Sequence, residues 1–456
     1  MPDLKALIKA LPGRKALGKG WFLVGGAVRD AFLGRPTRDW DVVVPENALG
    51  AAKALSASAG RAPVVRLDDG VVRVIVGQGW VDLAELQGKD ITEDLARRDF
   101  TVNAMAVSPN GRLIDPTGGL ADLEARLIRA ISRKNLREDP LRCLRAFRFA
   151  SELGFSVDPK TVSWIKREAA GLERVAPERV WFELKLLLLG QHMPSALRAS
   201  WEARVMRVII PELMEADRNW GGNNLLAHSI DTASVAGGVL WNIGITPFAH
   251  YRKHLSILDD PSMRAVFILA ALLHDIGKPR TYQEEGEEVH FYGHDALGAR
   301  MAKRIAARLK MSGDEADALA LLVANHMHPH FLGQGDGPTR RAMNRFLRRV
   351  GAWAFPIVVL AYADALSSRL AHQGVVSHLI LAKSLHDFLE DIEKEKKKKP
   401  RLITGDDLIA MGLKPGPIFR EILEEIEDLR AEKKIRTKKA ALAAVRAILM
   451  EKGYLV

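Results

Sequence analysis

The sequence has a single cysteine, Cys143, among its 456 residues. One thiol cannot form an intramolecular disulfide, and it cannot supply a thiolate zinc site. No apolar run approaches the roughly 20 residues that span a bilayer. The N-terminal stretch MPDLKALIKALPGRKALGKG lacks the apolar core and the cleavage site of a signal peptide. We therefore expect a reduced, cytoplasmic setting, with neither a disulfide framework nor a membrane partner.

Acidic residues are present but outnumbered. Lys and Arg total 67 against 56 for Asp and Glu, which gives a net charge of +11. A basic excess suits a polyanionic partner such as RNA through phosphate contacts. Simple solubility is the alternative explanation for the same charge. The hydrophobic share of 48% is ordinary for a globular protein.

Two kinds of periodicity divide the chain. The first third has short β-branched runs between turns, such as DWDVVVP and GVVRVIVG, and these predict the strands of a small sheet. From about Ser132 helical periodicity dominates, and Ile392–Pro400 is expected to break it before a last helical stretch. The predicted fold class is α+β, with a small mixed-sheet head followed by a long all-α neck, body and tail. The expected boundaries are 1–131 for the head, 132–219 for the neck, 220–390 for the body and 391–456 for the tail.

The segment FLVGGAVRDAFLGRPTRDWDVVVP carries most of the chemistry. A strand is expected to end at Gly25 and Gly26, with a helix starting at Ala27. Two glycines there would let backbone N–H groups approach a phosphate. Asp39 and Asp41 flank Trp40 at the start of the next strand, where residues two apart share a face.

Converging carboxylates favour Mg²⁺, and a two-metal site can align an attacking hydroxyl with a triphosphate. Asp82, in the strand-like GWVDLAEL, is the predicted third carboxylate, with Glu85 as the alternative. The head is therefore predicted to hold a metal-dependent transferase site.

The residues Gly25, Gly26 and Arg29 of GGAVRD, followed by RDWDVVV, resemble the head of the class II tRNA nucleotidyltransferase and bacterial poly(A) polymerase family. The resemblance continues over most of the chain. It implies template-independent transfer of nucleotides from CTP and ATP to the 3′ end of tRNA, with Mg²⁺ at the head.

Two further motifs extend this resemblance. LARRDFTVNAMAV is similar to the ribose-recognition motif and implies nucleotide contacts from Arg98, Asp99 and Asn103. Asp99 and Asn103 are four apart, so on a helix they would share a face.

REDPLRCLRAFRF is similar to the base-selection motif, which falls on Glu138, Asp139 and Arg142. The alternative interpretation makes Asp139 a helix N-cap with Pro140 in the first turn. Arg179 and Glu183, in ERVWFELKLLL, are similar to the motif that braces the neck helices.

The segment between Asp82 and the RRD motif is short, LAELQGKDITEDLA. Full CCA-adding relatives carry a longer loop there, so the short segment resembles the CC-adding branch. Addition of CCA, of CC only or of the terminal A stays open at this point. A poly(A) polymerase is the alternative within the same chemistry.

The helical body holds a second cluster. His274 and Asp275 follow an apolar helix in AVFILAALLHDIGKPRTY, and two adjacent polar groups there are costly unless ligated or hydrogen-bonded. Imidazoles and carboxylates without thiolates suit Mg²⁺, Mn²⁺, Fe, Ni or a similar divalent ion. Lys278 is the predicted phosphate contact. The ordered set resembles the HD phosphohydrolase superfamily, with expected metal ligands His228, His274, Asp275, His294, His326 and Asp364.

The resemblance associates such a domain with phosphatase and 2′,3′-cyclic phosphodiesterase activities. A competing function is therefore a metal-dependent phosphohydrolase that keeps the head as an RNA-binding module. A non-catalytic RNA-binding protein is a third alternative. In the tail, a basic cluster could grip tRNA phosphates, and its members are Lys433, Lys434, Arg436, Lys438 and Lys439.

Overall fold

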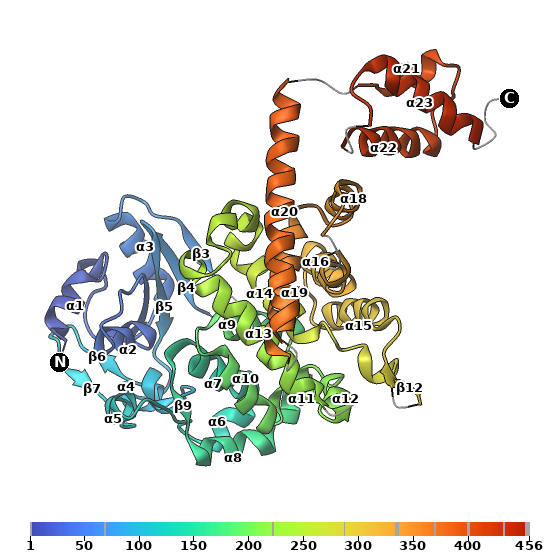
Figure 1. Cartoon of the computed structure of the whole chain (residues 1–456). Coiled ribbons are helices and arrows are strands. Elements are labelled where there is room, and N and C mark those ends of the chain that lie inside the picture. Colours follow the sequence, from blue (N-terminus) through green and yellow to red (C-terminus); the bar gives the residue numbers. More distant parts are fainter. Residues whose placement is uncertain are drawn as a thin grey trace. The chain divides into compact units, whose positions relative to one another are not determined.

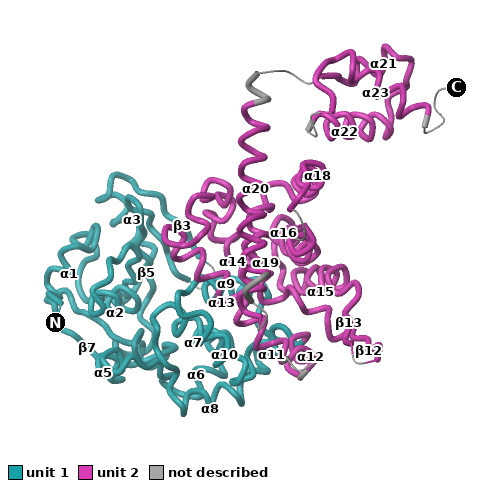
Figure 2. Tube along the Cα trace, viewed as in Figure 1, with its two compact units in different colours: residues 1–211 teal, residues 212–456 magenta. Residues whose placement is uncertain are grey.

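The computed structural model of the chain forms two compact units, Met1–Pro211 and Glu212–Val456, which Figure 2 shows in different colours. Each unit is described by itself. The structure describes residues 2–67, 70–220, 223–286, 288–332, 337–368, 371–398, 402–431 and 434–451.

A seven-stranded mixed sheet forms the centre of the head. Its strand order is β3-β4-β5-β2-β1-β6-β7, with β2 and β5 parallel and the other neighbours antiparallel. The predicted strands in DWDVVVP, GVVRVIVG and GWVDLAEL form β2, β4 and β5, which confirms the predicted mixed sheet. The strands are β1 (Phe22–Val24), β2 (Asp39–Val44), β3 (Val64–Arg66), β4 (Val72–Val76), β5 (Gly79–Glu85), β6 (Ala106–Val107) and β7 (Leu113–Ile114).

Short helices connect these strands (Figure 1). The helix after β1 begins at Gly26, one residue before the expected start. The side chains of Val24, Val43, Leu95 and Ala106 lie in one buried cluster, so the sheet packs on the helix that ends just before Arg97. The helices are α1 (Leu4–Ala10), α2 (Gly26–Phe32), α3 (Ala48–Ser58), α4 (Ile91–Ala96) and α5 (Gly119–Glu124).

The rest of the first unit is helical apart from a short parallel pair, β8 (Leu127–Ile128) with β9 (Ser156–Val157). Leu144, Phe147, Leu184 and Leu188 are among its fully buried side chains, and they recur at helical spacing. The helices are α6 (Arg133–Glu138), α7 (Leu141–Leu153), α8 (Pro159–Glu168), α9 (Pro177–Leu189), α10 (Met193–Glu202) and α11 (Val205–Ile209).

The second unit is a bundle of helices with two short antiparallel strand pairs, β10 (Asn219–Trp220) with β11 (Asn223–Asn224) and β12 (Gln283–Glu285) with β13 (Glu288–His290). Helix α14 is buried along nearly its whole length, from Ala265 to Leu273. The helices are α12 (Leu213–Ala216), α13 (Leu225–Trp241), α14 (Pro261–Leu273), α15 (His294–Arg308), α16 (Gly313–Asn325), α17 (His328–Leu332), α18 (Arg340–Val350), α19 (Ala354–Ser367) and α20 (Ala371–Lys398). Ala249–Asp259 forms a 3₁₀ helix, η5.

Within the described residues, one stretch, Arg340–Ser367, is long and apolar enough to cross a membrane by length and composition alone. The share of its apolar window that is buried inside the protein is 67%. Its apolar half is α19, which packs between α13 and α20. Burial against other helices is the pattern of a core helix.

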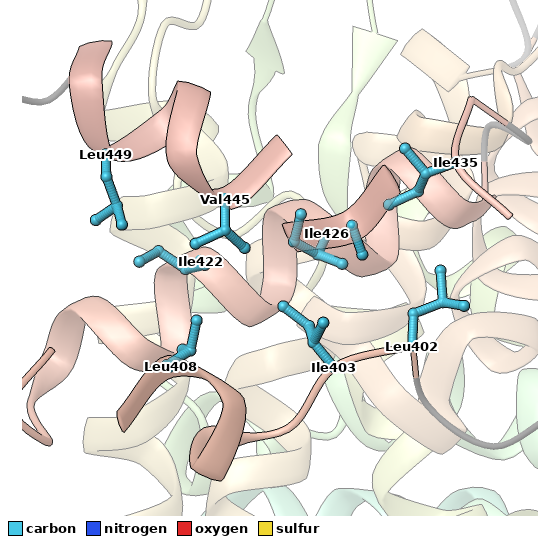
Figure 3. Close-up of a cluster of buried hydrophobic side chains, with 9 residues drawn as sticks. Leu402, Ile403, Leu408, Ile422, Ile426, Ile435, Val445 and Leu449 are labelled. Atoms are coloured by element: carbon cyan, nitrogen blue, oxygen red, sulfur yellow. The ribbon is translucent and has the colours of Figure 1, made fainter. Parts of the chain in front are cut away.

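The tail has a hydrophobic core of its own, shown in Figure 3. Leu408, Ile422, Ile426, Val445 and Leu449 face one another there from three helices. These helices are α21 (Gly405–Ala410), α22 (Pro417–Ala431) and α23 (Lys438–Glu451).

The expected break at Ile392–Pro400 is wrong for its described part, because α20 continues to Lys398 (Figure 1). Lys and Glu are good helix formers, and a charge run can therefore extend a helix as readily as end it.

Candidate active site and metal centre

Three carboxylates meet on one face of the head sheet. Asp41 of β2 lies directly opposite Asp82 of β5 in the parallel ladder, and Asp39 is two residues before Asp41 on the same face. Burial raises the pKa of Asp39 and of Asp41, and the nearby charge of Asp82 raises both further. The oxygens of Asp39 and Asp41 therefore fit Mg²⁺, whereas both oxygens of Asp82 accept hydrogen bonds from Arg73 in this structure.

The N–H groups of the glycine turn hydrogen-bond to acceptors within the protein. The N–H of Gly25 donates to the carbonyl of Met105 at 3.3 Å. The N–H of Gly26 hydrogen-bonds to Asp41 and lowers its pKa, which partly opposes the effect of burial. Gly25 has φ +69, and a Cβ on it would lie 2.9 Å from Asp41 Oδ2. Without nucleotide these N–H groups have protein acceptors, and their approach to a phosphate stays a prediction. The positive φ of Gly25 makes room for the carboxylate of Asp41.

A cavity of about 1280 Å³ brings together most of the predicted nucleotide-binding residues. Glu138 is not among the described lining residues, because α6 ends there and its exposed carboxylate lies 3.6 Å from Lys134 Nζ. The predicted residues that line the cavity are Gly25, Gly26, Arg29, Asp39, Asp41, Asp82, Arg98, Asp99, Asn103, Asp139 and Arg142.

Asp99 and Asn103 are joined, although not by a shared α-helix. Asp99 precedes the 3₁₀ turn Thr101–Asn103, so the expected helical face is wrong. Asn103 Nδ2 nevertheless donates to Asp99 Oδ1 at 3.1 Å, and Arg29 Nη1 donates to Asn103 Oδ1 at 2.8 Å. Arg145 donates to Asp99 Oδ2 through Nε and Nη2, at 3.1 and 2.8 Å.

The backbone N–H of Phe100 also donates to Asp99 Oδ1, at 2.8 Å. Each carboxylate oxygen of Asp99 therefore accepts two hydrogen bonds already. Burial would raise the pKa of Asp99, but the adjacent Arg145 guanidinium and these hydrogen bonds lower it overall. The anionic Asp99 orients Asn103 and Arg145 and keeps little acceptor capacity for a sugar hydroxyl.

Two of the residues predicted to select the base, Asp139 and Arg142, line the cavity together with Arg179. Asp139 Oδ2 lies 4.0 Å from Arg142 Nε and 3.4 Å from Arg179 Nη2. Asp139 is the C-cap residue that follows α6, and Pro140 is the N-cap residue of α7, so the N-cap falls one residue later than predicted. Asp139 Oδ1 still accepts from the N–H of Leu141 at 3.3 Å, as a capping carboxylate does.

Of the two residues predicted to brace the neck helices, Glu183 links α9 to α7, whereas Arg179 lies 3.4 Å from Asp139 Oδ2. Glu183 of α9 accepts from Arg145 at 2.7 Å and from Arg148 at 3.1 Å, both on α7. The arginines themselves were missed, although their i, i+3 spacing after Arg142 is visible in RCLRAFR. The sequence reasoning also missed Arg73 and Phe182, which line the cavity. Arg73 carried no signal, because a cross-strand partner cannot be read from one strand alone.

In the second unit, the six predicted ligands come together in two groups. One group is His228, His274 and Asp364, and the other is Asp275, His294 and His326. The ligand atoms within each group lie within 4.8 Å of one another. The sequence predicted one set of ligands, and the structure divides it into two groups. The adjacent residues His274 and Asp275 belong to different groups.

Three of the imidazoles are oriented by backbone carbonyls three residues earlier in the chain. His274 Nδ1 lies 2.9 Å from the carbonyl of Ala271, and His326 Nδ1 lies 2.7 Å from that of Val323. His294 Nδ1 lies 2.8 Å from the Phe291 carbonyl. In each case the bond runs three residues back along the chain and leaves Nε2 for the centre. Second ring nitrogens bonded in this way are typical of metal-ligating histidines.

The buried polar atoms also fit a cation. His274 Nε2 and Asp275 Oδ1 are buried and have no hydrogen bond of ordinary geometry with described residues, whereas Asp275 Oδ2 lies 2.6 Å from Lys278 Nζ. Burial alone would lower the pKa of His274, but Asp275 and Asp364 raise it to about 10. Burial would raise the pKa of Asp275, and the neighbouring cationic groups hold it well below its usual range. Anionic oxygens kept in a buried site are what a divalent ion requires.

Residues around this centre differ in their contacts. Lys278, the predicted phosphate contact, has its Nζ 2.6 Å from Asp275 Oδ2 and is ion-paired. Among the other histidines nearby, His330 contacts a ligand, with Nε2 at 3.1 Å from Asp364 Oδ2, and the ring of His378 lies 4.6 Å from that of His330. His290 stacks on Tyr292, and His328 lies 3.2 Å from Arg349 Nη1.

Family models match along the chain in the same order as these sites. The model described as "Poly A polymerase head domain" matches residues 21–129. The one described as "Probable RNA and SrmB- binding site of polymerase A" matches 154–217, and the HD domain matches 225–349. The fold and the carboxylate-lined head define a nucleotidyltransferase that also carries an HD domain.

Curated relatives are more specific. The chain is 33% identical over 436 residues to an A-adding tRNA nucleotidyltransferase of Deinococcus radiodurans, covering 93% of this chain and 95% of that protein. It is 31% identical over 438 residues to a CC-adding tRNA nucleotidyltransferase of Synechocystis, covering 92% of each. A CC-adding enzyme of Thermus thermophilus is also 31% identical, over 93% of each chain. The chain belongs to the tRNA nucleotidyltransferase family.

Solved structures share the fold. A CCA-adding enzyme in complex with ATP superposes with a TM-score of 0.66 at 22% identity, covering 98% of this chain and 94% of that one. A Thermotoga maritima CCA-adding enzyme in complex with tRNA gives a TM-score of 0.61 at 22% identity, with the same coverage.

Proposed function

We propose that this protein adds nucleotides from CTP or ATP to the 3′ end of tRNA and that it builds part of the CCA end. The observation that carries the proposal is the single cavity that joins Asp39, Asp41 and Asp82 to the base-selection pair Asp139 and Arg142. A nucleotide bound there would meet a carboxylate cluster at one end and a polar, base-reading wall at the other.

Two observations support the proposal that this protein adds only part of the CCA end. The segment between Asp82 and Arg98 is short, with α4 beginning at Ile91. Three curated relatives that match more than nine-tenths of this chain are named for A addition or for CC addition. A relative named multifunctional CCA protein, from Azoarcus, is 32% identical over 67% of this chain and 73% of its own length.

The proposal assigns roles to the carboxylates, to Asn103 and to the pair Asp139 and Arg142. Asp39, Asp41 and Asp82 would hold Mg²⁺; what the ions supply is activation of the RNA 3′-hydroxyl and neutralisation of charge on the leaving pyrophosphate. Asn103, fixed by Asp99 and Arg29, presents an amide to the sugar. Asp139 accepts from an exocyclic amine, and Arg142 donates to ring acceptors of cytosine or adenine.

The two ligand groups in the second unit support a second activity, hydrolysis of phosphate esters at RNA ends. The specific observation is the set of three imidazoles whose Nε2 atoms are aimed by local carbonyl bonds. Mg²⁺, Mn²⁺, Fe or Ni would suit these ligands. Because Lys278 is paired with Asp275, we propose that metal ions in the two ligand groups, and not Lys278, would bind the substrate phosphate.

We further propose the division into a head (1–131), a neck (132–219), a body (220–390) and an RNA-binding tail (391–456). In the tail, Lys434, Arg436, Lys438 and Lys439 are exposed, whereas Lys433 lies outside the described residues. Lys438 also pairs with Asp407 at 2.6 Å. A reducing cytoplasmic setting is supported by the lone, buried Cys143.

The test supplies Mg²⁺ and three tRNA substrates, ending before CCA, after the first C and after CC. Each is incubated with CTP alone, with ATP alone and with both, and products are separated at single-nucleotide resolution. We expect either two cytidines added to the first substrate or one adenosine added to the third. Asp39→Ala/Asp41→Ala protein serves as the inactive control.

Other outcomes distinguish the alternatives. Complete CCA synthesis from both nucleotides would overturn the partial share but keep the transferase. A long ladder from ATP alone would indicate a poly(A) polymerase. Absence of addition on all three substrates, with hydrolysis of a 2′,3′-cyclic phosphate that Asp275→Asn abolishes, would favour a phosphohydrolase with the head as an RNA-binding module.

A further inference from the structure

Arg73 is bound to Asp82 across the head sheet. Its Nε donates to Asp82 Oδ1 and its Nη2 donates to Asp82 Oδ2, both at 2.7 Å. In the antiparallel β4–β5 ladder the two residues are direct partners, and Asp82 is in turn the partner of Asp41 on β2. Arg73, Asp82 and Asp41 therefore form one row across three neighbouring strands, on the face that carries the active site.

The guanidinium is held from a second side. It lies over the ring of Trp80, 4.5 Å from the centroid, and Trp80 is opposite Asp39 in the β2–β5 ladder. The Arg73 side chain is 31% exposed and that of Asp82 is 15% exposed, so the pair is open to the cavity that both line. Stacking and a two-point hydrogen bond together hold the guanidinium in a defined place.

This pairing conflicts with a ligand role for Asp82. A carboxylate that gives both oxygens to a guanidinium has reduced capacity for Mg²⁺, and the positive charge of Arg73 opposes a cation in the same row. If Asp82 turns to a metal, Arg73 loses its partner inside a cavity that also receives a triphosphate. A planar guanidinium matches phosphate oxygens as well as it matches a carboxylate.

We propose that Arg73 is a positioning residue that exchanges partners, holding Asp82 in the free enzyme and passing to the triphosphate when a metal-bound nucleotide enters. Asp82 is thereby made available as the third carboxylate only when substrate arrives. The inference rests on the proposed function, because the triphosphate in it is CTP or ATP.

Direct ion binding tests the first half. Free Mn²⁺ is titrated into the whole protein without nucleotide, and bound ion is followed by electron paramagnetic resonance. Asp275→Asn/His274→Ala is placed in every background so that ions in the second unit do not contribute. Arg73→Gln is expected to tighten Mn²⁺ binding at the head about tenfold, because it frees Asp82 and removes one positive charge.

Arg38→Gln is the matched control. Arg38 lines the same cavity and its charge also acts on Asp39, yet it makes no contact with Asp82 among its described interactions. Its loss removes one charge without releasing the carboxylate, so a smaller gain is expected. Equal gains in the two variants would overturn the proposal, since the effect would then be net charge alone. Asp82→Asn in the Arg73→Gln background should cancel the gain.

Nucleotide binding tests the second half. Arg73→Gln should weaken CTP or ATP binding about tenfold in equilibrium dialysis with Ca²⁺, and Arg73→Lys should restore part of it. Unchanged nucleotide affinity in Arg73→Gln would overturn the exchange. Movement of the Arg73 guanidinium away from the Trp80 ring should change the fluorescence of Trp80 when nucleotide binds. This change should be lost in Arg73→Gln. Its persistence in that variant would mean that it does not arise from movement of the guanidinium.

These measurements do not need nucleotide addition. If the wild-type protein adds nothing to any tRNA, the proposed function fails, whereas the Mn²⁺ and nucleotide titrations still decide the exchange at Arg73.

Discussion

Arg348 of α18 donates through Nη2 to both oxygens of Asp428 of α22, at 2.8 and 2.7 Å. The Asp428 side chain is only 3% exposed, and Asn344 Nδ2 donates to it as well. Around this contact, Arg341 pairs with Glu425 at 2.8 Å, and Arg348 Nη1 donates to the Glu424 carbonyl at 3.1 Å. The tail, which has its own apolar core, is thus attached to α18 by charged groups.

We predict that Asp428→Asn loosens this attachment. Replacing one member of a nearly buried charged pair costs about 1–3 kcal/mol, which corresponds to an opening equilibrium larger by roughly five- to 150-fold. Hydrogen–deuterium exchange should show accelerated exchange along α18 and α22. Glu424→Gln is the control on the same helix, because Glu424 pairs with the largely exposed Arg420 and such pairs contribute little. Similar exchange in both variants would contradict an anchoring role for Asp428.

The Asp99–Arg145 pair predicts a specific acid sensitivity. The pKa of Asp99 lies below its ordinary value of 3.8 in the folded protein. The anionic group therefore contributes its full stabilisation above about pH 3.8, and this is lost as pH falls through the folded-state pKa. Asp99→Asn should destabilise the protein at pH 6, with a smaller difference from wild type below pH 3.8. Urea unfolding at both pH values measures it, with the exposed Glu124→Gln as control; a difference independent of pH would contradict the assignment.

The thiol of Cys143 is predicted to be inert in the folded protein. Cys143 is fully buried in α7, and burial, helped by the charges of Glu168 and Asp139, raises its pKa to about 12. The thiolate is the reactive form, so almost none is present at pH 8. A disulfide reagent that releases a coloured thiol should report no reaction at pH 8 in buffer and one equivalent in guanidinium chloride. Rapid reaction of the native protein would show that α7 opens locally.

Metal binding in the second unit should stabilise the protein. An ion that binds the folded state stabilises it by about 2.7 kcal/mol at one hundred times its dissociation constant. Mn²⁺ or Ni²⁺ should therefore raise the unfolding temperature, and a chelator should reverse the change. Asp275→Asn should abolish most of the gain, whereas His250→Asn, an exposed histidine outside both ligand groups, should keep it. An equal gain in Asp275→Asn protein would place the ions elsewhere.

Local patterns predicted the parts of the molecule that local physics decides. The alternation in DWDVVV places Asp39 and Asp41 on one face whatever the strand pairs with, and β2 confirms the strand. The apolar run before His274 predicts a buried helix that ends at the polar pair, as α14 does.

Contacts between residues on neighbouring strands could not be predicted from local sequence patterns. Arg73 meets Asp82 only because β4 and β5 pair in one register, and a shift by one residue would put them on opposite faces. In the same way, the sequence does not show that the N–H groups of Gly25 and Gly26 have acceptors within the protein. In the structure the N–H of Gly25 donates to the Met105 carbonyl, and that of Gly26 donates to Asp41.

The two ligand groups of the second unit are joined by a single peptide bond, between His274 and Asp275. Neither group can shift at the end of α14 without moving a ligand of the other. Two ions bound at these groups would therefore be thermodynamically linked. A change that one ion made in the backbone at that bond would alter the affinity for the other, and the effect would be reciprocal.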